Sequence, residues 1–146
     1  VLSSTRLFTA PPLDTAIGVN FDGGLRLLGV DLPPEPARAG QVWRVTVAWQ
    51  ALTPVETDLG SVVQLLDSSG RLRSQVNRPP GTRPTTAWLP GEIAVSPYDL
   101  ELPADLASGA YRLIAALYDP DRPGLPRLRL LPGGQDVAEL GQVFIP

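Results

Sequence analysis

The stretch "QVWRVTVAWQ", residues 41–50, alternates between two kinds of side chain. In an extended chain, Trp43, Val45, Val47 and Trp49 lie on one face, and more polar residues lie on the other. A period of two residues is that of a β-strand with one buried face. We therefore predict a half-buried strand here, and we assign both tryptophans to the protein core rather than to a ligand site.

Turn-forming residues divide the rest of the chain into short segments. The 17 prolines and 14 glycines recur at the spacing of about 8–12 residues that is typical of a β-sandwich or barrel. Between these turns we expect seven to nine strands in total. Besides residues 41–50 they include 25–32, 61–67, 71–76, 92–102, 111–118, 126–131 and 137–145. The pattern predicts an all-β fold, a two-sheet antiparallel β-sandwich of the immunoglobulin-like kind.

Three segments indicate how these strands are placed. The segment "SVVQLLD" (61–67) is apolar on both sides, which is typical of a strand in the middle of a sheet. The segment "DSSG" (67–70) predicts a tight hairpin into the next strand. Pro97 cannot donate a ladder hydrogen bond, so its strand is expected at a sheet edge or to contain a bulge there.

The stretch "LPADLASGAYRLIAALYD" (102–119) predicts a crossover followed by a strand. Tyr111 follows Gly109 at the corner, where β-sandwiches use a tyrosine hydroxyl to bind a backbone group a few residues upstream. We interpret Tyr111 as this structural corner rather than as a functional residue. The predicted core contains Val45, Val47, Trp49, Val63, Leu65, Leu113 and Leu117.

Length and charge limit the organisation of the chain. With 146 residues we expect one β-sandwich domain over 1–146, in which residues 1–18 form a lead-in segment. The chain contains no methionine, so we expect it to be a piece of a longer protein or a processed form. No apolar run has the roughly 18 residues of a membrane span. The net charge is −3 and the arginines are scattered singly, which disfavours a nucleic-acid partner.

The residue types restrict the chemistry. Cysteine and histidine are both absent, which excludes disulfides, Ser-His-Asp and Cys-His catalysis and most zinc sites. The carboxylates lie mostly in turns, so a two-carboxylate glycosidase is the weakest of three functional hypotheses. Asp119 and Asp121 in "YDPDRPG" have a spacing that calcium could use, but a polar turn is favoured because the rest of a calcium loop is missing. We expect no catalytic residue, no metal and no cofactor.

Three aromatic residues are candidates for ligand binding. Trp88 lies in the polar, proline-rich segment "RPTTAWLPGE" (83–92), and Tyr98 follows closely in "SPYDL". Exposed aromatic rings there, together with Tyr118, could stack on a sugar. The alternative, which we favour for Trp88, is a tryptophan that plugs one end of the sandwich.

The chain resembles a known family over residues 19–145. The residues that carry the resemblance are the strand ending in Trp49, the "PTxxWxPGE" turn with Pro84, Trp88, Gly91 and Glu92, and the "LPxxLxxGxYRL" corner with Gly109 and Tyr111. These motifs are similar to those of a β-sandwich module that follows the membrane part of bacterial, Chloroflexi-type, glycosyltransferase-39-like proteins. The sequence departs from this pattern at Gln64, where histidine is usual, and at Asn77, where aspartate is usual.

The resemblance implies a non-catalytic accessory or interaction domain of a membrane-bound cell-envelope glycosyltransferase. Its partner would be the rest of the parent membrane protein, and its location would be extracytoplasmic. The alternative hypothesis is a carbohydrate-binding module of an extracellular glycan-active protein, which would bind a glycan at the exposed aromatic residues.

Overall fold

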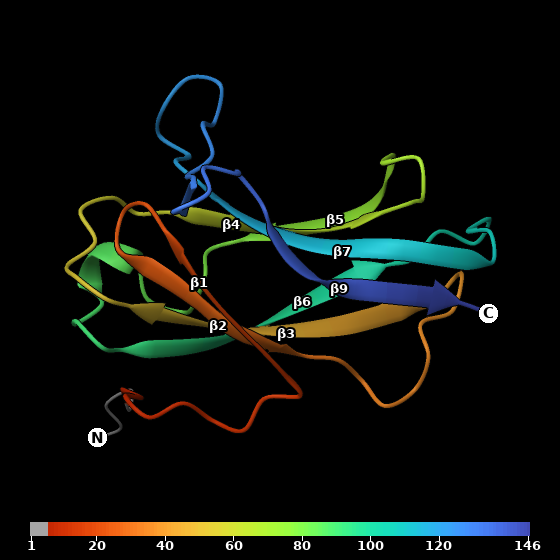
Figure 1. Cartoon of the computed structure of the whole chain (residues 1–146), viewed down its shortest axis with the longest axis horizontal. Coiled ribbons are helices and arrows are strands. Elements are labelled where there is room, and N and C mark those ends of the chain that lie inside the picture. Colours follow the sequence, from red (N-terminus) through yellow and green to blue (C-terminus); the bar gives the residue numbers. More distant parts are fainter. Residues whose placement is uncertain (1–5) are drawn as a thin grey trace.

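The computed structural model describes residues 6–146 and consists of two antiparallel β-sheets packed face to face (Figure 1). One sheet has five strands in the order β6-β3-β2-β1-β8, and the other has four in the order β5-β4-β7-β9. The strands are β1 (Thr15–Phe21), β2 (Leu25–Asp31), β3 (Val42–Ala51), β4 (Gly60–Leu66), β5 (Leu72–Arg78), β6 (Ile93–Glu101), β7 (Gly109–Tyr118), β8 (Leu130–Leu131) and β9 (Ala138–Ile145). The predicted all-β, two-sheet antiparallel sandwich is confirmed.

The core between the sheets follows the predicted alternation. All seven predicted core residues, from Val45 on β3 to Leu117 on β7, are fully buried in one apolar cluster. Trp43 and Trp49 are buried in the same cluster, as expected from the face that they share with Val45 and Val47. Burial of this apolar surface is the main force that holds the two sheets together.

The predicted placement of three strands is also confirmed. β4 lies between β5 and β7, in the middle of its sheet. β6, which contains Pro97, is an edge strand, so the missing N–H leaves the ladder with β3 intact. Residues 67–70 join β4 to β5 in a hairpin, in which the Asp67 carboxylate accepts hydrogen bonds from the backbone N–H of Ser69 and of Arg71, both at 2.9 Å.

The expected lead-in segment is wrong at its end, because residues 15–18 belong to strand β1. The alternation there is broken by Gly18, which has a φ of +68°, and the pairing with β2 shifts register between Ala16 and Val19. Such a bulge interrupts the period of two by which a strand is recognised in a sequence. The strand expected over 126–131 is shortened to Leu130–Leu131. Among the described residues no helix is long and apolar enough to cross a bilayer.

Tyr111 forms the predicted corner. Its hydroxyl donates a hydrogen bond of 2.6 Å to the backbone carbonyl of Ala107, four residues upstream. The ring is buried in the core cluster. The tyrosine therefore fixes the chain where it enters β7, which is the structural role that the sequence predicted.

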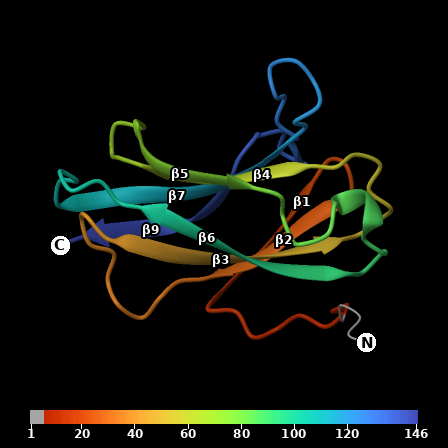
Figure 2. The same ribbon diagram turned by 180° about the vertical axis from the view of Figure 1, so that it is seen from behind.

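An ionic clasp holds the segment before β1 against the sandwich. This segment runs along the outer side of the five-stranded sheet (Figure 2), and Leu7 forms an isolated bridge with Ile93 at the start of β6. The clasp consists of Glu92, which is almost fully buried, with Arg6 and Arg83 as ion-pair partners. Burial raises the pKa of the Glu92 carboxyl, but the Leu89 N–H and the two guanidinium groups outweigh this effect, so the net pKa lies below its usual value.

Candidate functional site

Trp88 does not form an exposed platform. The short 3-10 helix Thr85–Ala87 turns the chain so that the indole points into the sandwich, where it is only 4% exposed and belongs to the core cluster. Its Nε1–H donates to the Arg83 carbonyl at 3.0 Å. The alternative that we favoured, a plug at one end of the sandwich, is what the structure contains, and no face of this ring is free to stack on a ligand.

Tyr98 is also buried, which corrects its expected role. The ring is 0% exposed and lies between the sheets. The Trp49 Nε1–H donates to the Tyr98 hydroxyl at 3.0 Å, and that hydroxyl lies 2.6 Å from Ser61 Oγ, which donates to the Arg78 carbonyl. Because Trp49 and Tyr98 come from one sheet and Ser61 from the other, this hydrogen-bonded chain connects the two layers.

Tyr118, the third aromatic candidate, is half-buried at the end of β7. Its ring lies over Gly60, its partner on β4, so closely that a Cβ on Gly60 would be 2.5 Å from the Tyr118 Cζ. Within residues 6–146 its hydroxyl has no hydrogen-bond partner. Of the three candidates, Tyr118 alone is partly exposed to solvent.

Tyr118 borders a groove on the outer face of the four-stranded sheet, which we call the outer-face groove. The chain after β7 turns back so that Tyr118 forms an antiparallel bridge with Arg127, and bridged residues point to the same face. Figure 1 shows this loop, residues 119–129, standing above the sheet. The groove has a volume of about 330 Å³ and is lined by Val62, Gln64, Gln75, Asn77, Tyr118, Leu125 and Arg127.

A layer of apolar side chains lies beneath the outer-face groove. Val62 on β4 pairs with Ala116 on β7, and Ile114 pairs with Gln64 in the next row. Val62, Ile114 and Ala116 are each at most 4% exposed, although they lie on the opposite face from the core cluster. Longer side chains around them must therefore cover this layer.

The rim of the outer-face groove consists of polar side chains without a carboxylate. Gln64 donates from Nε2 to the Oε1 of Gln75 at 2.9 Å, and Asn77 lies one row further along the same pair of strands. Amide groups can both donate and accept hydrogen bonds, and Arg127 adds further donors. A few such groups around a concave surface are typical of a site that binds a small polar molecule.

A neighbouring hollow enlarges the surface around Tyr118. It has a volume of about 490 Å³ and shares Tyr118 and Asn77 with the outer-face groove. Its other lining residues are Asp58, Leu59, Gly60, Arg78, Pro79, Thr82, Arg83, Pro84 and Pro120. Tyr118 therefore stands between two concave surfaces, each large enough for part of a small ligand.

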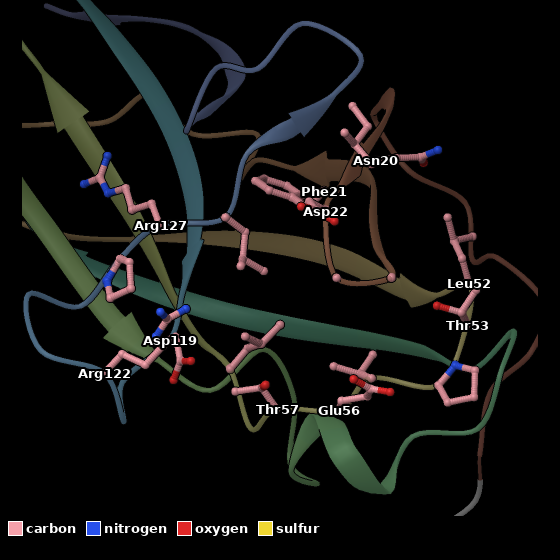
Figure 3. A pocket seen from close by; sticks show the side chains of 18 residues that line it. Asn20, Phe21, Asp22, Leu52, Thr53, Glu56, Thr57, Asp119, Arg122 and Arg127 are labelled. Atoms are coloured by element: carbon pink, nitrogen blue, oxygen red, sulfur yellow. The ribbon is translucent and has the colours of Figure 1, made fainter.

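A third and larger cavity, of about 670 Å³, lies at the end of the sandwich (Figure 3). Asp22, Glu56 and Asp119 line it, together with Arg122 and Arg127. The three carboxylates come from different loops and are exposed or half-exposed.

The pair Asp119 and Asp121 forms the favoured polar turn. The Asp119 carboxylate accepts the Asp121 backbone N–H at 3.0 Å. In residues 6–146 no group of three or more acidic side chains gathers where a metal ion could bind.

Sequence reasoning identified only part of the groove. Tyr118 was named as a candidate, and Gln64 and Asn77 were noted as departures from the family pattern. Gln75 and Arg127 were missed. The hairpin at residues 67–70 did not give Gln75 away, because the pairing shifts register between Leu65 and Leu66, and only this shift places Gln75 opposite Gln64.

The fold defines the chain as a β-sandwich domain, and comparison with known proteins agrees with this class. The chain is similar to the crystal structure of the C-terminal domain of Wzt, with 14% identity and a TM-score of 0.59, over 94% of this chain and 82% of that one. It also matches the CARDB domain of a Pyrococcus furiosus protein in complex with di-metal ions, with 14% identity and a TM-score of 0.46, over 90% and 96% of the chains. No family model and no curated protein matches the sequence.

Proposed function

We propose that this chain is a non-catalytic accessory domain that binds a glycan in the outer-face groove. The observation that carries the proposal is the groove itself, which is lined by amides, a tyrosine and an arginine on one face of a sheet. Sugars present apolar C–H faces and hydroxyl groups that both donate and accept hydrogen bonds. Amide groups match the hydroxyls, and the Tyr118 ring matches the C–H faces.

The surface around Tyr118 also supports a ligand longer than a single sugar. Tyr118 and Asn77 connect the groove to the neighbouring hollow, and Arg127 connects it to the end cavity. An oligosaccharide that crosses Tyr118 would contact two of these surfaces at once. A tyrosine between two concave surfaces is a suitable place for such a chain to stack.

The proposed setting is a membrane-bound glycosyltransferase of the cell envelope, with this domain on the extracytoplasmic side. This part of the proposal rests on the resemblance of the "PTxxWxPGE" turn and the "LPxxLxxGxYRL" corner to the family module. The gene that encodes the chain should then specify several apolar segments of about 20 residues upstream of Val1. A signal peptide followed by an enzyme without such segments would instead favour the carbohydrate-binding module of an extracellular protein.

The glycan site is tested by titrating the domain with a panel of neutral and acidic oligosaccharides, followed by calorimetry and by backbone amide NMR shifts. We expect shifts at Gln64, Asn77 and Tyr118. Tyr118→Ala should weaken binding by about tenfold or more, the effect of losing about 1.4 kcal/mol at a binding hot spot. The matched control is Phe144→Ala, because Phe144 is an aromatic residue with 66% exposure at the other end of the same sheet.

A second variant keeps the test valid if Tyr118→Ala perturbs the fold. Gln64→Leu removes the amide but keeps a side chain of similar size over the apolar layer, and it should also weaken binding. If no member of the panel binds, or if both groove variants bind as well as Phe144→Ala, the proposed function is wrong.

A further inference from the structure

Arg127 is an arginine without an acceptor. It is half-buried at the junction of the outer-face groove and the end cavity. The other half-buried arginines all have acceptors. Arg6, Arg73 and Arg83 have carboxylates, Arg26 has the Asn20 amide oxygen, and Arg78 has the Pro79 and Pro97 carbonyls. Among residues 6–146 nothing accepts a hydrogen bond from the Arg127 side chain.

The surroundings of Arg127 do not neutralise it. On the groove side it faces the neutral side chains of Gln64, Gln75, Asn77 and Tyr118. On the other side, Asp22, Glu56 and Asp119 line the end cavity, but none of them forms an ion pair with Arg127. A guanidinium group has five N–H donors, and removing part of it from water without an acceptor is unfavourable.

The position of Arg127 is fixed by the backbone. Tyr118 bridges Arg127, the Asp119 N–H donates to the Pro126 carbonyl at 3.0 Å, and the Leu128 N–H donates to the Leu117 carbonyl at 2.9 Å. These bonds hold residues 126–128 as a short extension of the four-stranded sheet. The guanidinium group is thus presented beside Tyr118 by an ordered segment.

We propose that the ligand of the outer-face groove is an acidic glycan whose anionic group binds the guanidinium of Arg127. This inference rests on the proposed glycan site. The overall charge of the chain is −3, so attraction by the whole protein would not select such a ligand. A carboxylate or a phosphate oxygen can accept two parallel N–H bonds from one guanidinium. The amides and Tyr118 would bind the neutral part of the same sugar.

The test uses pairs of probes that share one sugar chain, of which one member carries an anionic group and the other does not. One pair is tetragalacturonate and its methyl ester, and the other is mannotetraose with and without a 6-phosphate. We expect at least one acidic probe to bind about 10- to 100-fold more tightly than its neutral partner, as for a hydrogen bond to a charged group. The pair that shows the difference identifies the anion as a carboxylate or a phosphate.

Two variants locate the effect. Arg127→Gln should remove the preference, so that the acidic and the neutral probe of a pair bind this variant with similar affinity. Arg122→Gln is the matched control, because Arg122 is exposed on the same loop and lines only the end cavity, so it should keep the preference.

The outcomes separate this inference from the proposed function. Equal binding of acidic and neutral probes, or a preference that survives Arg127→Gln, overturns the role of Arg127 and leaves the glycan site standing. If no probe of either charge binds and Tyr118→Ala changes nothing, the glycan site fails and this inference fails with it.

Discussion

Replacing Tyr98 by phenylalanine should destabilise the domain although the ring itself is preserved. The Tyr98 hydroxyl accepts a bond from Trp49 Nε1–H and is bonded to Ser61 Oγ, at 3.0 Å and 2.6 Å. The variant loses both bonds in a fully buried site. It also leaves the indole N–H of Trp49 without an acceptor between the two sheets.

The magnitude follows from these two bonds and the orphaned donor. Two neutral hydrogen bonds contribute about 1 kcal/mol each, and an unsatisfied buried donor costs about 1–3 kcal/mol, part of which overlaps with the first sum. We expect Tyr98→Phe to lower the free energy of unfolding by about 3 kcal/mol. For a domain of this size that corresponds to a fall of about 6–12 °C in Tm.

The assay is urea unfolding monitored by circular dichroism, with Tyr118→Phe as the control. Tyr118 carries a hydroxyl that has no partner in the described part of the chain, so its removal should change stability by less than about 0.5 kcal/mol. A double-mutant cycle with Ser61→Ala should show coupling of about 0.5–1.5 kcal/mol. If Tyr98→Phe is as mild as the control, or the cycle shows no coupling, the interlayer chain does not stabilise the fold.

Tyr98 should also make the stability of the domain depend on pH. Burial raises the pKa of the Tyr98 phenol, and the bonds from Ser61 and Trp49 offset this only in part. The stability that comes from keeping the phenol neutral is complete below the unfolded pKa of about 10. It is lost as the pH rises from there through the folded pKa, because only the unfolded chain ionises easily. Tyr98→Phe should remove this alkaline loss, which is measured by urea unfolding between pH 9 and pH 11.

Three further changes test other parts of the structure. Glu92→Gln should lower the free energy of unfolding by about 1–3 kcal/mol at pH 7. Because the folded pKa of Glu92 is lowered, the wild type should lose this advantage over the variant as the pH falls below about 4.5. Equal acid sensitivity of the two proteins in urea unfolding would contradict the clasp. Tyr111→Phe should cost about 1 kcal/mol by urea unfolding, through loss of the corner hydrogen bond, and a neutral effect would argue against the corner. Gly60→Ala should displace the Tyr118 ring and lower the free energy of unfolding by about 1–3 kcal/mol. It should also weaken glycan binding measured by calorimetry. An affinity equal to that of the wild type would show that the position of the ring does not matter for binding.

The fold could be predicted from the sequence because its core strands follow local rules. The alternation in residues 41–50 and 111–118 placed the buried faces correctly, and the tyrosine corner followed from a short motif. β1 was not predicted because Gly18 and a bulge interrupt its period of two residues. Its pairing with β2 is a tertiary feature, which local patterning does not contain.

The candidate site was harder to predict because its residues come from segments far apart in the chain. The outer-face groove combines β4, β5, the end of β7 and the loop after it, so it requires the register of three strands and the return of that loop. The candidate role of Tyr98 was misleading, since polar neighbours in the sequence do not show where a ring points, whereas for Trp88 the favoured alternative of a buried plug was correct. Trp88 turns inward after a 3-10 helix, and Tyr98 lies on the inner face of an edge strand.

The ionic clasp at Glu92 has a mechanical consequence. The segment before β1 begins at the end of the sandwich opposite the C-terminus (Figures 1 and 2), so a pulling force between the two acts roughly along the strands. Hydrogen bonds between strands that are pulled lengthwise must break together, which resists tension better than opening them one at a time. The force would enter the fold through Arg6, Glu92 and the adjoining bridge between Leu7 and Ile93.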